Sequence, residues 1–112
     1  MKTVTDRPCA QGDLLFIPVD EIPTGLATTK PKDGVFIVGH SETGHHHVIE
    51  ATRAEVFEPA DDEFTAWVRS LGAKVEHKRS FDTHETLYLP EGNYQIRRQR
   101  EYMPEGYRRA AD

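Results

Sequence analysis

The chain has 112 residues, a net charge of −5 and one cysteine. Its length fits a single domain over 1–112 with a modest core, and one cysteine excludes an intramolecular disulfide framework. The acidic balance disfavours nucleic acid as a partner, and without a signal peptide or a run of ~20 apolar residues we expect a cytoplasmic protein that does not span a membrane.

The first half of the chain contains short apolar runs separated by turn residues. After an N-terminus expected to fray over about residues 1–10, the Gly12-Asp13 pair opens a strand that reaches residue 19. A second strand over 35–39 follows the turn residues 32–34. The runs 48–51 and 55–58 have the pattern of a short hairpin across 52–54.

The segment 61–71 fits two structures. Phe64, Trp67, Val68 and Leu71 have the spacing of an amphipathic helix, which Asp61 or Asp62 would cap. Thr65 to Ser70 also suits a strand, because Thr, Trp and Val pack well on a pleated surface. Both alternatives stay open at this point.

The remaining segments alternate like strands. These are 73–77, 84–89 and 93–103, with 90–93 as the turn of a closing hairpin, followed by a loose tail over about 104–112. We therefore expect a mainly β fold, a small barrel or sandwich of about six to eight short strands, with one short helix near 61–71 as the open alternative.

Four of the six histidines lie within residues 40–47, directly after an apolar strand. Neutral imidazole is the commonest metal-binding side chain. In an extended segment His45 and His47 point to one side and His46 to the other, so His45 and His47 form the preferred ligand pair.

Further ligands must come from other positions. His84 is the best distant candidate, and His40 or Glu42 would complete the shell. Whether His77 or Glu85 joins them stays open. These donors suit Zn²⁺ best, with Fe, Mn or Ni as alternatives, in a structural or a catalytic site.

Two resemblances support a metal site. Gly39, His45, His47 and Glu50 resemble the first cupin motif, although the gap before Glu50 is shorter. That resemblance implies metal bound inside a β-barrel and, in its enzymatic form, metal-dependent chemistry.

The chain also resembles a family of small uncharacterised bacterial and phage proteins. The resemblance lies in 12–14, in the block His-Ser-Glu-Thr-Gly-His-His-His at 40–47, and in 84–94 with Gln-Arg-Glu-Tyr at 99–102. It implies no particular activity.

Two classes of function follow. The first is a small metal-binding β protein, and whether it is an enzyme stays open. The second is a non-enzymatic binding or assembly module, phage-related in character, whose histidines lie at a loop or at the subunit interface of a homo-oligomer. The arginines at 97–100 with nearby tyrosines resemble a nucleic-acid surface, but the net charge favours a solvated strand.

Overall fold

A computed structural model of the chain describes residues 1–39, 46–59, 65–77, 84–98, 100–103 and 106–109, with only the backbone at positions 39, 84, 100–103 and 106–109. The described residues form thirteen strands and one short 3₁₀ helix. In chain order they are β1 (Lys2–Thr3), β2 (Cys9–Gln11), β3 (Leu14–Val19), β4 (Ala27–Thr28), β5 (Val35–Gly39), β6 (His47–Glu50), η1 (Ala51–Arg53), β7 (Ala54–Glu58), β8 (Thr65–Ser70), β9 (Ala73–His77), β10 (His84–Leu89), β11 (Gly92–Arg98), β12 (Arg100–Met103) and β13 (Gly106–Arg109).

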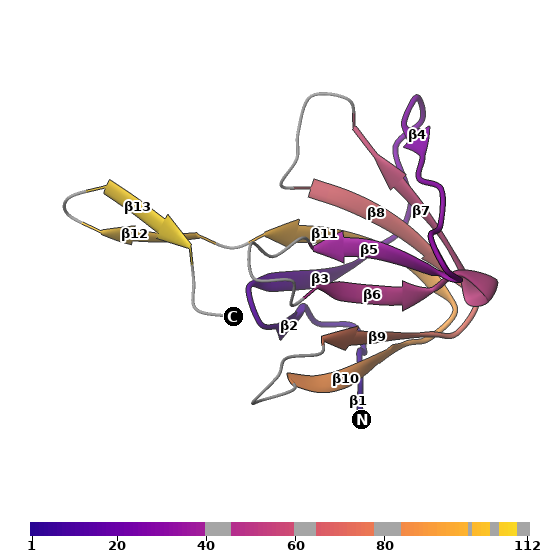
Figure 1. The fold of residues 1–112 in the computed structure, drawn as a ribbon, viewed down its shortest axis with the longest axis horizontal. Coiled ribbons are helices and arrows are strands. Elements are labelled where there is room, and N and C mark those ends of the chain that lie inside the picture. The colour runs from indigo at the N-terminus through magenta and orange to yellow at the C-terminus, as the bar shows by residue number, and fades with distance from the viewer. Residues whose placement is uncertain (40–45, 60–64, 78–83, 99, 104–105, 110–112) are drawn as a thin grey trace.

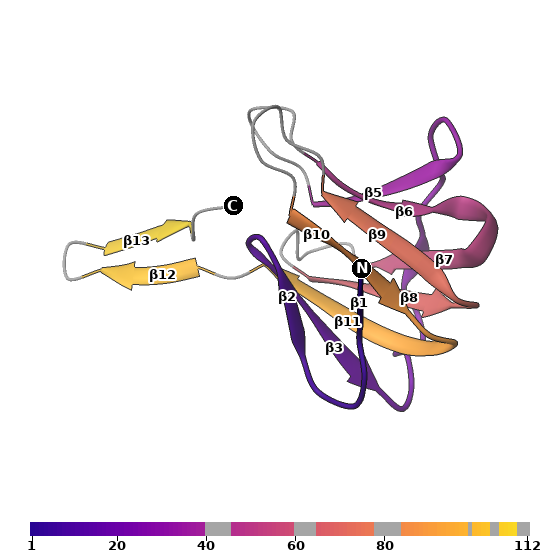
Figure 2. The same cartoon turned by 90° about the horizontal axis from the view of Figure 1, so that it is seen from below.

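Eleven of these strands form two sheets that face each other (Figures 1 and 2). Sheet A has five strands in the order β1-β10-β9-β6-β5, and sheet B has six in the order β2-β3-β11-β8-β7-β4. The expected mainly β sandwich is confirmed. There are more strands than expected, because several, such as β1 and β4, are only two residues long.

The core fills the space between the sheets, and the alternation along each strand produces it. In β8, for example, Ala66, Val68 and Ser70 are buried, while Thr65 and Trp67 are partly exposed and Arg69 is exposed. The largest fully buried side chains are those of Leu14, Phe16, His47, Ile49, Val56, Val68, Val75, His77, Leu87, Leu89 and Ile96, together with Val4 near the N-terminus. Two histidines are thus among the core residues.

Four connections carry the chain from one sheet to the other at the same end of the sandwich, which we call the corner. They are residues 29–34 between β4 and β5, η1 between β6 and β7, residues 71–72 between β8 and β9, and residues 90–91 between β10 and β11 (Figure 1). The backbone of Leu71 donates a hydrogen bond to the carbonyl of Arg53 at 2.8 Å, which ties two of these connections together.

The corner corrects two predicted hairpins. Residues 48–51 and 55–58 do not pair with each other, because η1 directs β6 into sheet A and β7 into sheet B. Likewise β10 pairs with β9 and β1, whereas β11 pairs with β3 and β8. The predicted turn at 90–93 therefore leads from β10 in sheet A to β11 in sheet B and does not close a hairpin.

The open choice at 61–71 is decided in favour of the strand over Thr65–Ser70, and 61–64 lie outside the described residues. Two of the first residues, expected to fray, form β1, which pairs in parallel with β10, and Val4 is 1% exposed. Within the tail expected to be loose, Gly106–Arg109 pairs with β12.

The described part of the chain contains no helix of the length and apolar character that crossing a bilayer requires.

Candidate functional site

At the end opposite the corner, three histidines occupy neighbouring positions across sheet A. His47 on β6 is the register partner of His77 on β9, and His77 is also the register partner of His84 on β10. Positions directly opposite in antiparallel strands lie on the same face of a sheet. The fold therefore brings the backbone of two predicted ligands, His47 and His84, to either side of His77.

The rings of His47 and His77 are stacked inside the sandwich. Their centroids are 3.8 Å apart, the planes differ by 16°, and the residues are 1% and 0% exposed. They continue the inward-facing series of their strands, which includes Ile49 and Val75. A polar ring in such surroundings is costly unless its nitrogens are satisfied.

Gln11, at the end of β2, holds one nitrogen of His47. Its amide nitrogen donates to the carbonyls of Val75 and Glu85 at 2.9 and 3.0 Å, and these two bonds determine which end of the amide is the oxygen. That oxygen lies 2.9 Å from His47 Nδ1. Since an amide oxygen only accepts, Nδ1 of His47 must carry a proton.

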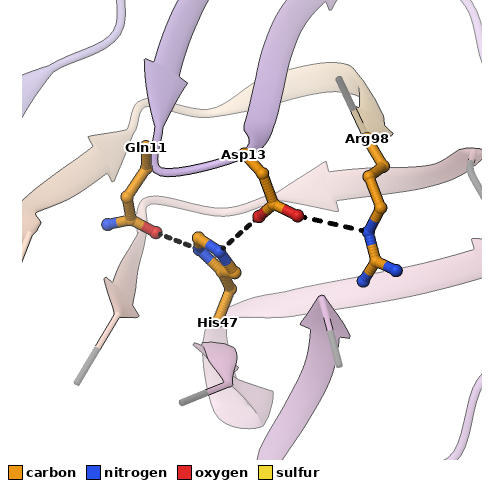
Figure 3. A network of polar contacts seen from close by, with 4 residues as sticks. All are labelled: Gln11, Asp13, His47 and Arg98. Carbon is orange, nitrogen blue, oxygen red and sulfur yellow. Dashed lines mark hydrogen bonds and ion pairs between the residues drawn. The ribbon is translucent and has the colours of Figure 1, made fainter. Parts of the chain in front are cut away.

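Asp13, in the turn between β2 and β3, faces the other nitrogen. Its Oδ1 lies 3.2 Å from His47 Nε2, and its Oδ2 lies 3.5 Å from Arg98 Nε (Figure 3). Burial acts to raise the pKa of the Asp13 carboxyl, but the hydrogen bond with His47 and the electrostatic influence of His47 and Arg98 outweigh burial and lower this pKa. Asp13 is therefore a carboxylate at neutral pH.

These contacts define an electrostatic requirement between His47 and Asp13. A neutral imidazole with its proton on Nδ1 has only a lone pair on Nε2. That lone pair would face a carboxylate oxygen at 3.2 Å, which is repulsive. A positive species must therefore bridge the two atoms, either a second proton on His47 or a metal ion bound by both.

Gly12 makes the close approach of this turn possible. Its φ is +58°, a region that favours glycine, and a Cβ built there would lie 3.1 Å from Cε1 of both His47 and His77. The backbone of the turn thus packs directly against the stacked rings. The turn between β2 and β3 of sheet B thus covers the stacked rings of His47 and His77, which belong to sheet A.

The predicted ligands have different outcomes. His47 lies in the polar network that it forms with Gln11, Asp13 and Arg98, and the backbone of His84 is placed by its register. His45, His40 and Glu42 lie outside the described residues. Within the ranges that the structure describes, no three His, Cys, Asp or Glu side chains come together as a metal-binding group.

His77 and Glu85, which sequence left undecided, take different places. His77 stacks on His47. The carboxylate of Glu85 is exposed and lies 3.5 Å from the N-terminal amine. Glu85 contributes to the network only through its backbone carbonyl, which accepts from Gln11.

Sequence reasoning missed three residues of the network: Gln11, Asp13 and Arg98. Arg98 had a signal, since it shares one face of its strand with Tyr94 and Ile96, and both of these are buried. Asp13 was identified only as a turn residue. Nothing local distinguishes Gln11, because its partners lie 36 to 74 residues away in the chain.

Comparison with known proteins places the chain in one family. Residues 10–99 match the model of a family described as a domain of unknown function (DUF8820). The chain belongs to this family. The DUF8820 match includes Gln11, Asp13, His47, His77 and Arg98, and it ends before β12. No curated protein and no solved structure gives a significant match.

Proposed function

We propose that this protein binds a divalent metal ion, with His47 Nε2 and the Asp13 carboxylate as two of its ligands. The observation that carries the proposal is the pair of contacts made by the His47 ring, with Nδ1 2.9 Å from the amide oxygen of Gln11 and Nε2 3.2 Å from the Asp13 carboxylate. With its proton on Nδ1, a neutral His47 presents the lone pair of Nε2 to a metal ion. Histidines that bind metal characteristically donate their other N–H to a fixed acceptor, and Gln11 is that acceptor here.

The spacing of the two atoms suits a shared ion. In a tetrahedral site with bonds of about 2.0 to 2.1 Å, two ligand atoms are about 3.3 Å apart. His47 Nε2 and Asp13 Oδ1 are 3.2 Å apart, close to that separation. Arg98 then balances the remaining charge on the Asp13 carboxylate from the other side.

The remaining ligands would come from the positions that sequence indicated. His84 is two strands away from His47 at the same register level. His45, His40 and Glu42 precede His47 by two to seven residues. This donor set of imidazole and carboxylate favours Zn²⁺, with Fe, Mn or Ni as alternatives.

Such an ion would join the two sheets. His47 belongs to sheet A, and Asp13 directly precedes β3 of sheet B, so the ion would link residues 34 positions apart in the chain. Because metal binding to a folded site contributes to folding free energy, removal of the ion is expected to lower the Tm.

Elemental analysis of untagged protein tests the proposal. The wild type, His47→Gln and Asp13→Asn would be compared with His46→Gln, a matched control at the adjacent, half-buried histidine. We expect about one ion per chain in the wild type and the control. The other two variants should contain less metal, because their affinity for the ion should be at least about tenfold weaker. Circular dichroism would establish that each variant is folded.

The alternative species, a second proton on His47, predicts a different result. In that case the wild type holds no stoichiometric Zn, Fe, Mn or Ni after purification or reloading, and chelators leave its Tm unchanged. That outcome would overturn the proposed function. It would identify the His47–Asp13 contact as a buried ion pair.

A further inference from the structure

The hairpin of β12 and β13 forms a sheet of its own. Within the described residues these strands pair with each other and join neither sheet A nor sheet B. Both views show the hairpin extending away from the sandwich (Figures 1 and 2). An isolated two-stranded hairpin is at best marginally stable in water, so this one needs a surface to pack against.

Its register gives the hairpin two different faces. Arg100 is opposite Arg109, and Tyr102 is opposite Tyr107. Since alternate positions of a strand share a face, these four positions lie on one face, which we call the Arg-Tyr face. The positions of Glu101 and Arg108, which are opposite each other, lie on the other face.

The Arg-Tyr face calls for an acidic partner. Like charges placed directly opposite each other across two strands destabilise a hairpin, and Arg100 and Arg109 are such a pair. An anionic group bound at these positions would remove that penalty. Tyrosine and arginine are also among the residues most enriched at the energetic centres of protein interfaces.

The rest of this chain has the required charge. Residues 1–99 contain 16 Asp and Glu against 11 Lys and Arg, whereas 100–112 contain three of each. A second copy is therefore an acidic protein surface that is always present with the hairpin. Nucleic acid would bring its own phosphates against the same acidic body, which opposes its binding.

The family match separates the hairpin from the domain. It covers 10–99, so the matched region ends at the residue that precedes β12. We infer that β12–β13 is an arm that binds the acidic body of a second copy of this chain through its Arg-Tyr face. This inference does not depend on the proposed metal site.

Two variants of the full-length chain form the test. Arg109→Glu reverses a charge on the Arg-Tyr face, and Arg108→Glu makes the same change at the neighbouring position on the opposite face. Sedimentation would be measured over a concentration series. We expect a wild-type dimer, a dimer dissociation constant at least about tenfold larger for Arg109→Glu, and little change for Arg108→Glu.

Other results would overturn the inference. If the wild-type chain stays monomeric at all concentrations, a second copy is not the partner. If the two variants weaken the dimer equally, the Arg-Tyr face is not the binding surface. Binding of a generic single-stranded oligonucleotide that Arg109→Glu abolishes, in a chain that stays monomeric, would identify nucleic acid as the partner instead. Circular dichroism of both variants would establish that the sandwich is folded.

Discussion

Gly12 is the residue at which the turn between β2 and β3 touches the stacked histidines. Alanine at this position would combine a strained φ of +58° with a Cβ 3.1 Å from His47 and His77, which are packed on both sides and have little room to move. We expect Gly12→Ala to lower the free energy of unfolding by about 2 to 4 kcal/mol, measured by urea denaturation.

Gly34→Ala is the matched control for this substitution. Gly34 also has a positive φ, +80°, but a Cβ there meets no atom within 4 Å. It therefore reports the backbone strain alone, about 1 kcal/mol. Equal losses for the two variants would show that contact with the histidines adds nothing to the cost at Gly12.

The residues of the candidate site differ in how far sequence could identify them. His47 was found because four histidines are crowded into eight positions and strand alternation selects among them. Asp13 and Gln11 needed the tertiary fold, since the turn that carries them reaches His47 only once the two sheets face each other. Local patterns contain no information on such a contact.

Among the elements, the corner depends on one small side chain. Ser70 is 1% exposed, and its hydroxyl donates to the carbonyl of Leu89 at 2.7 Å and accepts from the backbone of Gly72 and Ala73 at 3.0 and 3.1 Å. One hydroxyl thus satisfies three buried backbone groups where β8 turns into β9 and β10 ends.

Ser70→Ala should therefore cost more than a typical serine substitution. It leaves those three groups without this partner, and we expect the free energy of unfolding to fall by about 2 to 4 kcal/mol in urea denaturation. Thr52→Ala, at an exposed position of η1 in the same corner, should change it by less than about 0.5 kcal/mol. A Ser70→Ala chain as stable as Thr52→Ala would contradict the assigned role of the hydroxyl.

The positions of the strands were more predictable than their partners. Apolar runs between turn residues located β3 and β5, and alternation located β9 and β10. The pairing of 84–89 with 93–103 was wrong, since two strands joined by a turn look the same in sequence whether they pair or enter different sheets. The deciding contacts, such as the pairing of β11 with β3, join segments from opposite ends of the domain.

At the scale of the whole molecule, polar groups join the two sheets at both ends of the sandwich. The Gln11-His47-Asp13 network lies at one end, and the hydroxyl of Ser70 bonds across the corner at the other. The apolar core fills the space between them. Because each end joins strands of both sheets, loss of either network should destabilise the entire sandwich, and unfolding should remain a single cooperative transition.

Tyr94 connects this global stability to pH. It is 5% exposed, and its hydroxyl donates to the carbonyl of Pro90 at 2.8 Å. Burial, and to a lesser extent the charge of Tyr88, raises the pKa of Tyr94 above its ordinary value. The folded chain therefore keeps the phenolic proton at a pH where the unfolded chain, with an ordinary pKa near 10, has released it.

The sign of the effect follows from this difference. The contribution of Tyr94 is fully present below about pH 9 and is lost as the pH rises above about 10, by up to about 1.4 kcal/mol per pH unit until the folded-state pKa is reached. Tyr94→Phe should cost about 1 kcal/mol at neutral pH, because the bond to Pro90 is lost. The variant should then lose stability less steeply than the wild type between about pH 9 and 11 in urea denaturation. Parallel curves for the two proteins over that range would show that Tyr94 does not couple alkaline pH to unfolding.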